Sequence, residues 1–171
     1  MNLSRRSLIT TATASVFWPH TAFARTARQI TWDDLIPPGV PYSEIIGPGQ
    51  VDEVNDTWLP VFDENAVKLN DALDGAYIRM PGYILPWDMT SEGVTSFILV
   101  PYVGACIHVP PPPANQLVFV TTDKPWASTD LWEAVWVTGE IRHEMQSTEV
   151  AEIGYNMTAD EMEVFEWDEN G

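Results

Sequence analysis

The chain has 171 residues, and its 25 acidic residues outnumber its 8 basic residues, which gives a formal net charge of −17. This charge repels nucleic acid and anionic lipid headgroups while favouring basic protein surfaces and cations, so we expect no nucleic-acid partner. Hydrophobic residues make up 45% of the chain, enough for a packed core, which argues against a disordered protein.

Residues 1–24 have the pattern of an export signal. Arg5 and Arg6 precede the mildly apolar stretch 10–18, and the segment ends on the small-x-small pattern Ala22-Phe23-Ala24, where a signal peptidase would cut. We interpret this as a cleaved twin-arginine signal, which predicts a periplasmic protein. Removing these 24 residues from the 171 leaves 147, with 6 basic and 25 acidic residues and a net charge of −19.

The apolar part of this signal is too short to remain as a membrane helix, which needs about 20 predominantly apolar residues. No later segment comes closer to that length. We therefore expect no integral membrane segment after signal cleavage.

Residues 25–66 are predicted to form an irregular arm. Thr31 is a candidate N-cap for a one-turn helix that a Pro-Pro pair would end. Residues 39–66 are rich in Pro, Gly, Asn and Asp, which favours irregular structure. The composition of residues 64–73 predicts a further short helix at the start of the following domain.

Beyond residue 76 the pattern changes to short β-type runs separated by turn signals. Strands are expected over 77–86, 94–100, 102–109, 116–120, 134–143, 150–157 and 162–167, with a loop over 121–133. The Pro81-Gly82 pair predicts a bulge or a sharply curved edge strand. This spacing is typical of a sandwich or a barrel, and the curvature favours a barrel.

Four motifs together resemble the DUF3299 family of exported bacterial proteins: Thr31-Trp-Asp-Asp-Leu-Ile-Pro37, Gly82-Tyr-Ile-Leu-Pro86, Val135-Trp-Val-Thr-Gly139 and, above all, the stretch 97–116. The resemblance covers nearly the whole chain after the signal. It implies an all-β fold, a small OB-like β-barrel over 67–171 with an irregular N-terminal arm over 25–66 and one or two short helices.

The same resemblance implies a place in the Gram-negative envelope, in some relatives beside genes for envelope ABC-transport components. An ABC-transport component is therefore a candidate partner. The resemblance implies no established enzymatic activity.

The stretch 97–120 contains the chain's single cysteine, Cys106, two residues before His108. Side chains at positions i and i+2 of a strand share a face, so this pair could bind one metal ion. A thiolate and an imidazole suit zinc or copper, with His143, Met80, Met145 or a carboxylate as a further ligand. Two alternatives stay open: Cys106 is a small buried hydrophobe, or it is a nucleophile with a histidine as its base.

A run of four prolines follows His108 and predicts a stiff, exposed crossing between strands, because proline cannot donate to a strand ladder. One interpretation is a rigid surface that a partner recognises. The other is that the prolines end a strand and direct the next polar side chains at backbone groups. The candidate interaction surface consists of Pro110, Pro111, Pro112, Pro113, Asn115 and Gln116.

The tryptophans in polar segments, Trp87, Trp126 and Trp132, are candidates for lining a groove that takes a sugar or a peptide. The acidic runs 140–145 and 160–169 are interpreted as solvated surface. The chain contains no HExxH, Gly-x-Ser-x-Gly, P-loop or dinucleotide-binding motif.

The sequence therefore favours an exported accessory or binding protein over an enzyme, with transition-metal handling through Cys106 and His108 as a candidate role. The alternatives are a thiol-dependent enzyme that uses Cys106 with a histidine base, and a purely structural barrel that binds other proteins.

Overall fold

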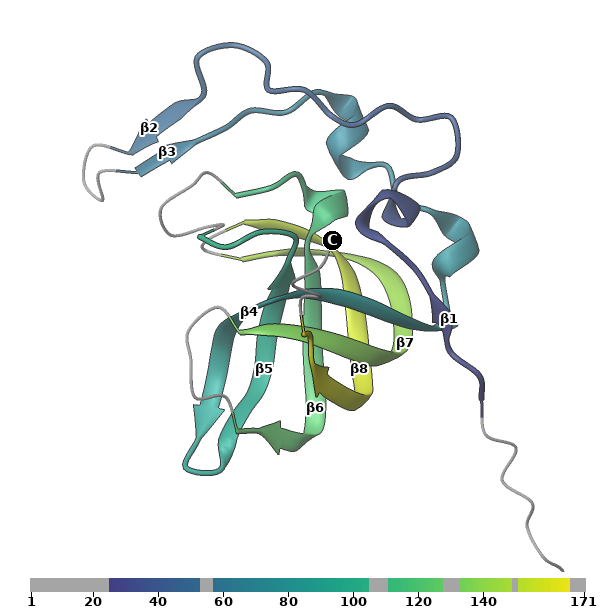
Figure 1. The fold of residues 1–171 in the computed structure, drawn as a ribbon. Coiled ribbons are helices and arrows are strands. Elements are labelled where there is room, and N and C mark those ends of the chain that lie inside the picture. The colour runs from purple at the N-terminus through teal and green to yellow at the C-terminus, as the bar shows by residue number, and fades with distance from the viewer. Residues whose placement is uncertain (1–24, 53–56, 105–110, 128–132, 149–150, 167–171) are drawn as a thin grey trace, which may run out of the picture.

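The computed structural model describes residues 25–52, 57–104, 111–127, 133–148 and 151–166. Five long strands form a barrel, with an N-terminal arm passing across one end of it (Figure 1). The barrel strands are β4 (Ala76–Thr90), β5 (Gly93–Val100), β6 (Val118–Trp126), β7 (Ala134–Ser147) and β8 (Glu152–Val164).

The barrel strands follow the order β4-β5-β6-β8-β7, and pairing between β4 and β7 closes the ring. All neighbours are antiparallel except β6 and β8, which run parallel. A five-stranded Greek-key barrel of this kind is the OB-type arrangement. The structure confirms the predicted all-β fold with a small OB-like barrel.

Strand β7 shows how the sequence specifies the barrel wall. Val135, Val137 and Ile141 are buried in the core, whereas Trp136 and Glu140 lie on the outer face, as the period of two requires. Gly139 sits where the register between β7 and β8 shifts, and a Cβ at this position would collide with the backbone of Thr158. Glycine at this position permits the close approach of the two strands.

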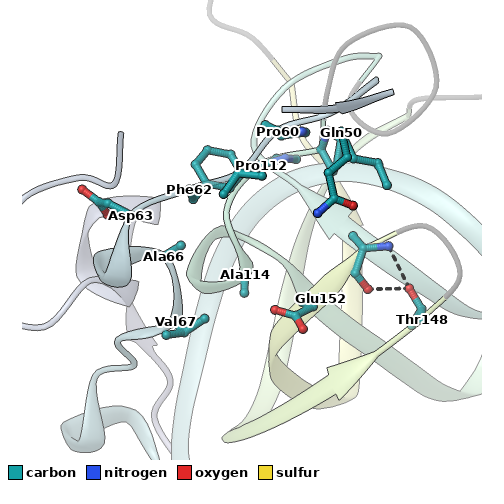
Figure 2. Close-up of a pocket in the computed structure, with 14 residues that line it drawn as sticks. Gln50, Pro60, Phe62, Asp63, Ala66, Val67, Pro112, Ala114, Thr148 and Glu152 are labelled. Carbon is teal, nitrogen blue, oxygen red and sulfur yellow. Dashed lines mark hydrogen bonds between the residues drawn. The ribbon is translucent and has the colours of Figure 1, made fainter. Parts of the chain in front are cut away.

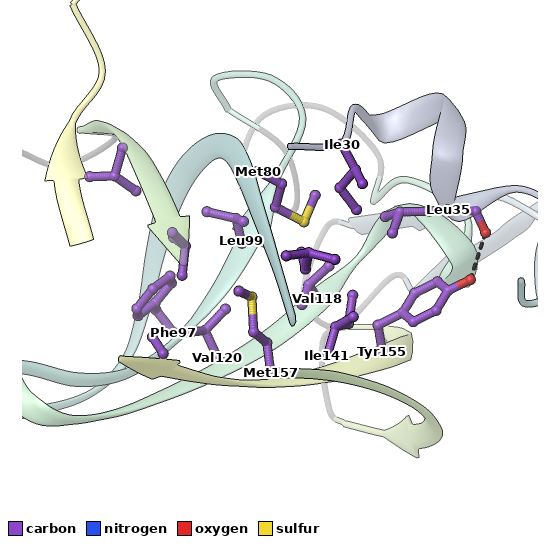
Figure 3. Close-up of a cluster of buried hydrophobic side chains, with 14 of the residues drawn as sticks. Ile30, Leu35, Met80, Phe97, Leu99, Val118, Val120, Ile141, Tyr155 and Met157 are labelled. Atoms are coloured by element: carbon purple, nitrogen blue, oxygen red, sulfur yellow. Dashed lines mark hydrogen bonds between the residues drawn. The ribbon is translucent and has the colours of Figure 1, made fainter. Parts of the chain in front are cut away.

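The main hydrophobic core fills the barrel, and the arm contributes to it (Figure 3). Ile30 and Leu35 from the arm are buried in the same cluster as the barrel side chains. A smaller cluster outside the main core consists of Ile98, Val100, Leu117 and Ile153. The larger cluster includes Ile78, Met80, Ile84, Phe97, Leu99, Val118, Val120, Val135, Val137, Ile141, Tyr155 and Met157.

The arm contains short elements. Strand β1 (Arg28–Gln29) pairs in parallel with β4, and β2 (Gln50–Asp52) pairs with β3 (Thr57–Leu59) as a separate hairpin. The 3₁₀ helix η1 (Trp32–Leu35) begins after Thr31, which confirms the predicted N-cap. Here the Thr31 amide and hydroxyl both donate to the Asp34 carboxylate, at 2.7 and 3.0 Å.

The prediction of one helix over 64–73 is wrong, because this segment forms two separate 3₁₀ helices, η2 (Glu64–Val67) and η3 (Asp71–Leu73). The Asp63 side chain accepts from the Asn65 amide, and the Asn70 side chain accepts from the Ala72 amide. Each polar side chain starts its own short helix, which interrupts a continuous one.

Other predictions about strands and loops also need correction. The predicted loop over 121–133 is wrong in its first half, because β6 continues to Trp126, which pairs with Val94. The two strands expected over 150–157 and 162–167 are one strand, β8, with a register shift in its pairing to β7. The irregularity expected at Pro81-Gly82 lies further along β4, between Pro86 and Met89.

The 3₁₀ helix η4 (Ala114–Gln116) precedes β6, where a strand was expected to start. In the described part of the chain, no helix is long and apolar enough to cross a membrane.

Candidate functional site

A cavity of about 450 Å³ lies between the arm and one end of the barrel (Figure 2). The arm contributes one wall from β3 and the segment up to η2. The barrel contributes the end of the proline run and the turn between β7 and β8. The lining residues are Gln50, Leu59, Pro60, Val61, Phe62, Asp63, Ala66, Val67, Pro111, Pro112, Ala114, Thr148, Ala151 and Glu152.

A second cavity of about 210 Å³ shares Phe62, Pro111 and Pro112 with the first. We call the two together the arm groove, because they share these three lining residues. The second cavity is lined by Tyr42, Ile45, Phe62, Tyr102, Pro111, Pro112 and Pro113.

Large apolar side chains are exposed along the same part of the arm. Val67 is 50% exposed and Val61 is 36% exposed, and both line the groove. Exposed apolar side chains gathered in one region mark interaction sites more often than single scattered ones do. The exposed members between residues 42 and 67 are Tyr42, Ile45, Ile46, Val51, Trp58, Leu59, Val61 and Val67.

Backbone hydrogen bonds hold the arm wall in shape. The Ile46 amide donates to the Val61 carbonyl at 2.7 Å, and the Asp63 amide donates to the Glu44 carbonyl at 2.9 Å. Further along, the Trp58 indole N–H donates to the Pro48 carbonyl at 2.7 Å. These hydrogen bonds therefore hold the arm wall in a defined conformation.

Two of the polar side chains that line the groove are acidic. Asp63 and Glu152 contribute carboxylates, and no lysine or arginine is found among its described lining residues. The Thr148 hydroxyl is engaged with the Ala151 backbone, donating to its carbonyl at 2.7 Å and accepting from its amide at 3.1 Å (Figure 2). Burial and the nearby Asp33 raise the pKa of Tyr42, so its hydroxyl stays neutral at physiological pH. These groups favour a cationic or donor-rich ligand.

The predicted thiol or metal pair, Cys106 and His108, lies outside the described residues, as does Pro110. Two of the candidate further ligands lie apart. Met80 is fully buried inside the barrel, whereas His143 faces η3, with its Nδ1 3.4 Å from Asp71 Oδ1 and its Nε2 3.6 Å from Asp74 Oδ2. Within the described ranges, no group of three or more His, Cys, Asp or Glu side chains is placed to hold a metal ion.

The predicted exposed crossing is corrected at its described residues. Pro112 and Pro113 are buried, and Asn115 and Gln116 are only 1% and 2% exposed, so these four do not form an accessible surface. Their burial follows from hydrogen bonds and packing against the arm. Pro111 and Pro112 still line the arm groove.

The alternative interpretation, that the polar side chains are directed at backbone groups, is confirmed. The side-chain amide of Asn115 donates to the backbone carbonyls of Asn65 and Lys68, at 2.9 and 3.2 Å. The side-chain amide of Gln116 donates to the backbone carbonyl of Trp32 at 3.0 Å. These bonds fasten the arm to the barrel below the groove.

The predicted tryptophan groove is not the arm groove, although one of its tryptophans, Trp126, lines a separate cavity of about 190 Å³. Trp87 is 43% exposed and meets Phe119 edge-on, while Trp126 is partly buried and donates its indole N–H to Glu133. Neither lines the arm groove, and Trp132 lies outside the described residues. The groove residues were missed because they lie in a segment without periodicity, where the only signal was apolar residues scattered among Pro and Gly.

No curated protein matches this chain. The chain is 35% identical to a DUF3299 family protein from Pseudomonas aeruginosa PAO1 whose crystal structure is known. That match covers 84% of this chain and 99% of the other, with a TM-score of 0.68. The profile of DUF3299, a family described as proteins of unknown function, matches residues 32–164, and the chain therefore belongs to the DUF3299 family.

Proposed function

We propose that this chain is an exported binding protein of the cell envelope, not itself an enzyme, that holds an extended segment of a partner protein in the arm groove. The observation that carries the proposal is the exposure of apolar side chains along the arm, beside a cavity of about 450 Å³. Apolar grooves with a few placed polar groups are the usual form of ligand sites.

The partner segment is apolar with at least one lysine or arginine. Leu59, Val61 and Val67 provide apolar contacts, and the Glu152 carboxylate attracts a cation. The net charge of −17 adds a long-range field that speeds the approach of a basic partner. Two adjoining cavities suit an extended segment better than a compact ligand.

The cellular setting of the proposal rests on the sequence and on the family. The signal-like residues 1–24 support export to the periplasm through the twin-arginine route. The family resemblance supports a component of an envelope ABC-transport system as the partner.

Transition-metal handling through Cys106 and His108 is the second part of the proposal, and it rests on their spacing in the sequence. It predicts stoichiometric zinc or copper in protein purified from the periplasm without chelators, and loss of that metal in Cys106→Ala. If elemental analysis finds no metal in the wild-type protein, the metal-handling part of the proposal is contradicted. The groove proposal is unaffected by that result.

Selection from a random peptide library displayed on phage tests the groove proposal. We expect the purified protein to enrich peptides that combine apolar residues with lysine or arginine. Enrichment of acidic peptides, or none above a selection on bare support, would contradict the proposal. The same selection on Val67→Asp should lose the enriched class.

A further inference from the structure

An aromatic pocket of about 200 Å³ lies apart from the arm groove and shares no described lining residue with it. Its aromatic walls come from three distant parts of the chain: Trp32 in η1, Tyr83 in β4 and Phe165 just after β8. The other lining residues are Pro81, Gly82, Pro101 and Ala134.

The pocket depends on the missing side chain of Gly82. A Cβ there would lie 2.9 Å from Trp32 Cζ2 and 2.7 Å from Leu99 Cγ, closer than real side chains pack. Glycine therefore lets the Trp32 ring approach the backbone of β4 and form one side of the pocket.

Hydrogen bonds and strand pairing hold the walls of the aromatic pocket in place. The Gln116 side chain donates to the Trp32 carbonyl at 3.0 Å, and the Phe165 amide donates to the Ala134 carbonyl at 2.8 Å. Tyr83 is paired with Ala134 across β4 and β7. A ligand would meet walls already in place, which lowers the entropic cost of binding.

The chemistry of the pocket selects for a cation with an apolar surface. Its described lining residues include no charged side chain, while the whole chain carries a net charge of −17. The faces of aromatic rings attract cations. An ammonium such as that of lysine is strongly hydrated, whereas a quaternary ammonium carries methyl groups that pack against aromatic and proline surfaces.

We propose that this aromatic pocket binds a quaternary ammonium group. The proposal is independent of the arm groove, because the two sites share no described lining residue. The group could be carried by a phosphocholine lipid headgroup or by a free choline-type solute, and the chemistry at the pocket is the same for both.

Titration calorimetry with choline and with 3,3-dimethylbutan-1-ol, its uncharged analogue of the same shape, tests the proposal. We expect choline to bind about tenfold more tightly, which is the scale of a partly desolvated cation–π contact. Equal or tighter binding of the uncharged analogue would overturn the proposal, as would the absence of choline binding.

Variants locate the binding. Phe165→Leu should weaken choline about tenfold, Phe165→Tyr should restore it, and Trp87→Leu serves as the matched control because Trp87 is an exposed aromatic residue outside the pocket. Unchanged choline binding in Phe165→Leu would contradict the assignment. Circular dichroism of each variant confirms that the barrel is intact.

Two further experiments distinguish the source of the ligand. Co-sedimentation with phosphatidylcholine vesicles that phosphatidylglycerol vesicles do not reproduce would assign the lipid headgroup. Binding of free phosphocholine without co-sedimentation would assign a soluble ligand. Failure of choline, phosphocholine and phosphatidylcholine vesicles alike to bind would contradict the proposal.

Discussion

The hydroxyl of Tyr155 donates a hydrogen bond of 2.6 Å to the backbone carbonyl of Leu35, 120 residues earlier in the chain (Figure 3). The same hydroxyl accepts from the Asn70 amide at 2.7 Å. Tyr155 lies on β8, Leu35 ends η1, and Asn70 immediately precedes η3. One buried side chain therefore connects the barrel to two segments, one on each side of the arm wall that forms the groove.

We expect Tyr155→Phe to destabilise the protein by about 1–3 kcal/mol, because the substitution leaves two backbone groups without this partner. Urea denaturation followed by tryptophan fluorescence measures the change. Tyr42→Phe is the matched control, since Tyr42 is exposed and its substitution should stay within about 0.5 kcal/mol. Equal stability of the two variants would show that the Tyr155 hydroxyl does not support the fold.

Alkaline pH should weaken the fold through the same residue. Burial raises the pKa of Tyr155 from 10.0 to about 12, with Asp71 adding to the rise and the Asn70 amide opposing it. Because the folded pKa lies above the unfolded one, this contribution to stability is complete below pH 10 and is lost as the pH rises towards 12.

Urea denaturation between pH 8 and pH 11 should therefore show stability falling above pH 10 in the wild type, with a shallower fall in Tyr155→Phe. Parallel curves for the two proteins would contradict this assignment of the alkaline transition.

Acidic pH should remove the stability that a different residue, Glu140, contributes to the fold. The guanidinium groups of Arg25 and Arg142, 3.0 and 2.6 Å from the Glu140 carboxylate, lower the pKa of Glu140 below its ordinary 4.5. Since the folded pKa is the lower one, the stability it contributes is present above pH 4.5 and is lost as the pH falls through the folded value.

We expect the stability difference between wild type and Glu140→Gln to be constant from neutral pH down to about pH 5 and to shrink in more acidic buffer. Salt at about 1 M should also shrink it, because these ion pairs are exposed. A difference that does not change with either pH or salt would mean that Glu140 acts through packing.

Electrostatics in the groove can be tested on a selected peptide. Glu152→Gln should weaken a basic peptide about threefold at low salt and reduce the salt dependence of its affinity, because Glu152 lines the groove. Glu144→Gln, an exposed change on β7 outside the described groove lining, is the control. The same loss in both variants would indicate a general charge effect.

The barrel was predictable because its strands alternate: at the start of β7, Val135 and Val137 enter the core while Trp136 lies outside it, and the motif around Val135 matches the family pattern. The groove beside the arm was not predictable, because no period indicates that Val61 and Val67 face a cavity. The sequence predicted that Asn115 and Gln116 reach backbone groups but not which ones, since their partners are backbone carbonyls 50 and 84 residues away. Local composition carries no information about contacts over such separations.

The end of β6 is another feature that local composition does not predict. Residues 121–126 contain Asp, Lys and Pro, which favour a loop, yet Trp126 pairs with Val94 beside the β4–β5 hairpin. Pairing with a neighbouring strand outweighed local propensity there.

The most direct test of the binding groove is the affinity of one selected peptide for two valine-to-aspartate variants, measured by fluorescence anisotropy. Val67 is 50% exposed and lines the groove, whereas Val164 is 53% exposed and does not line it, so the pair matches in chemistry and exposure. We predict that Val67→Asp weakens the peptide by about tenfold or more and that Val164→Asp leaves its affinity unchanged. Equal affinity for Val67→Asp and the wild type would contradict the account.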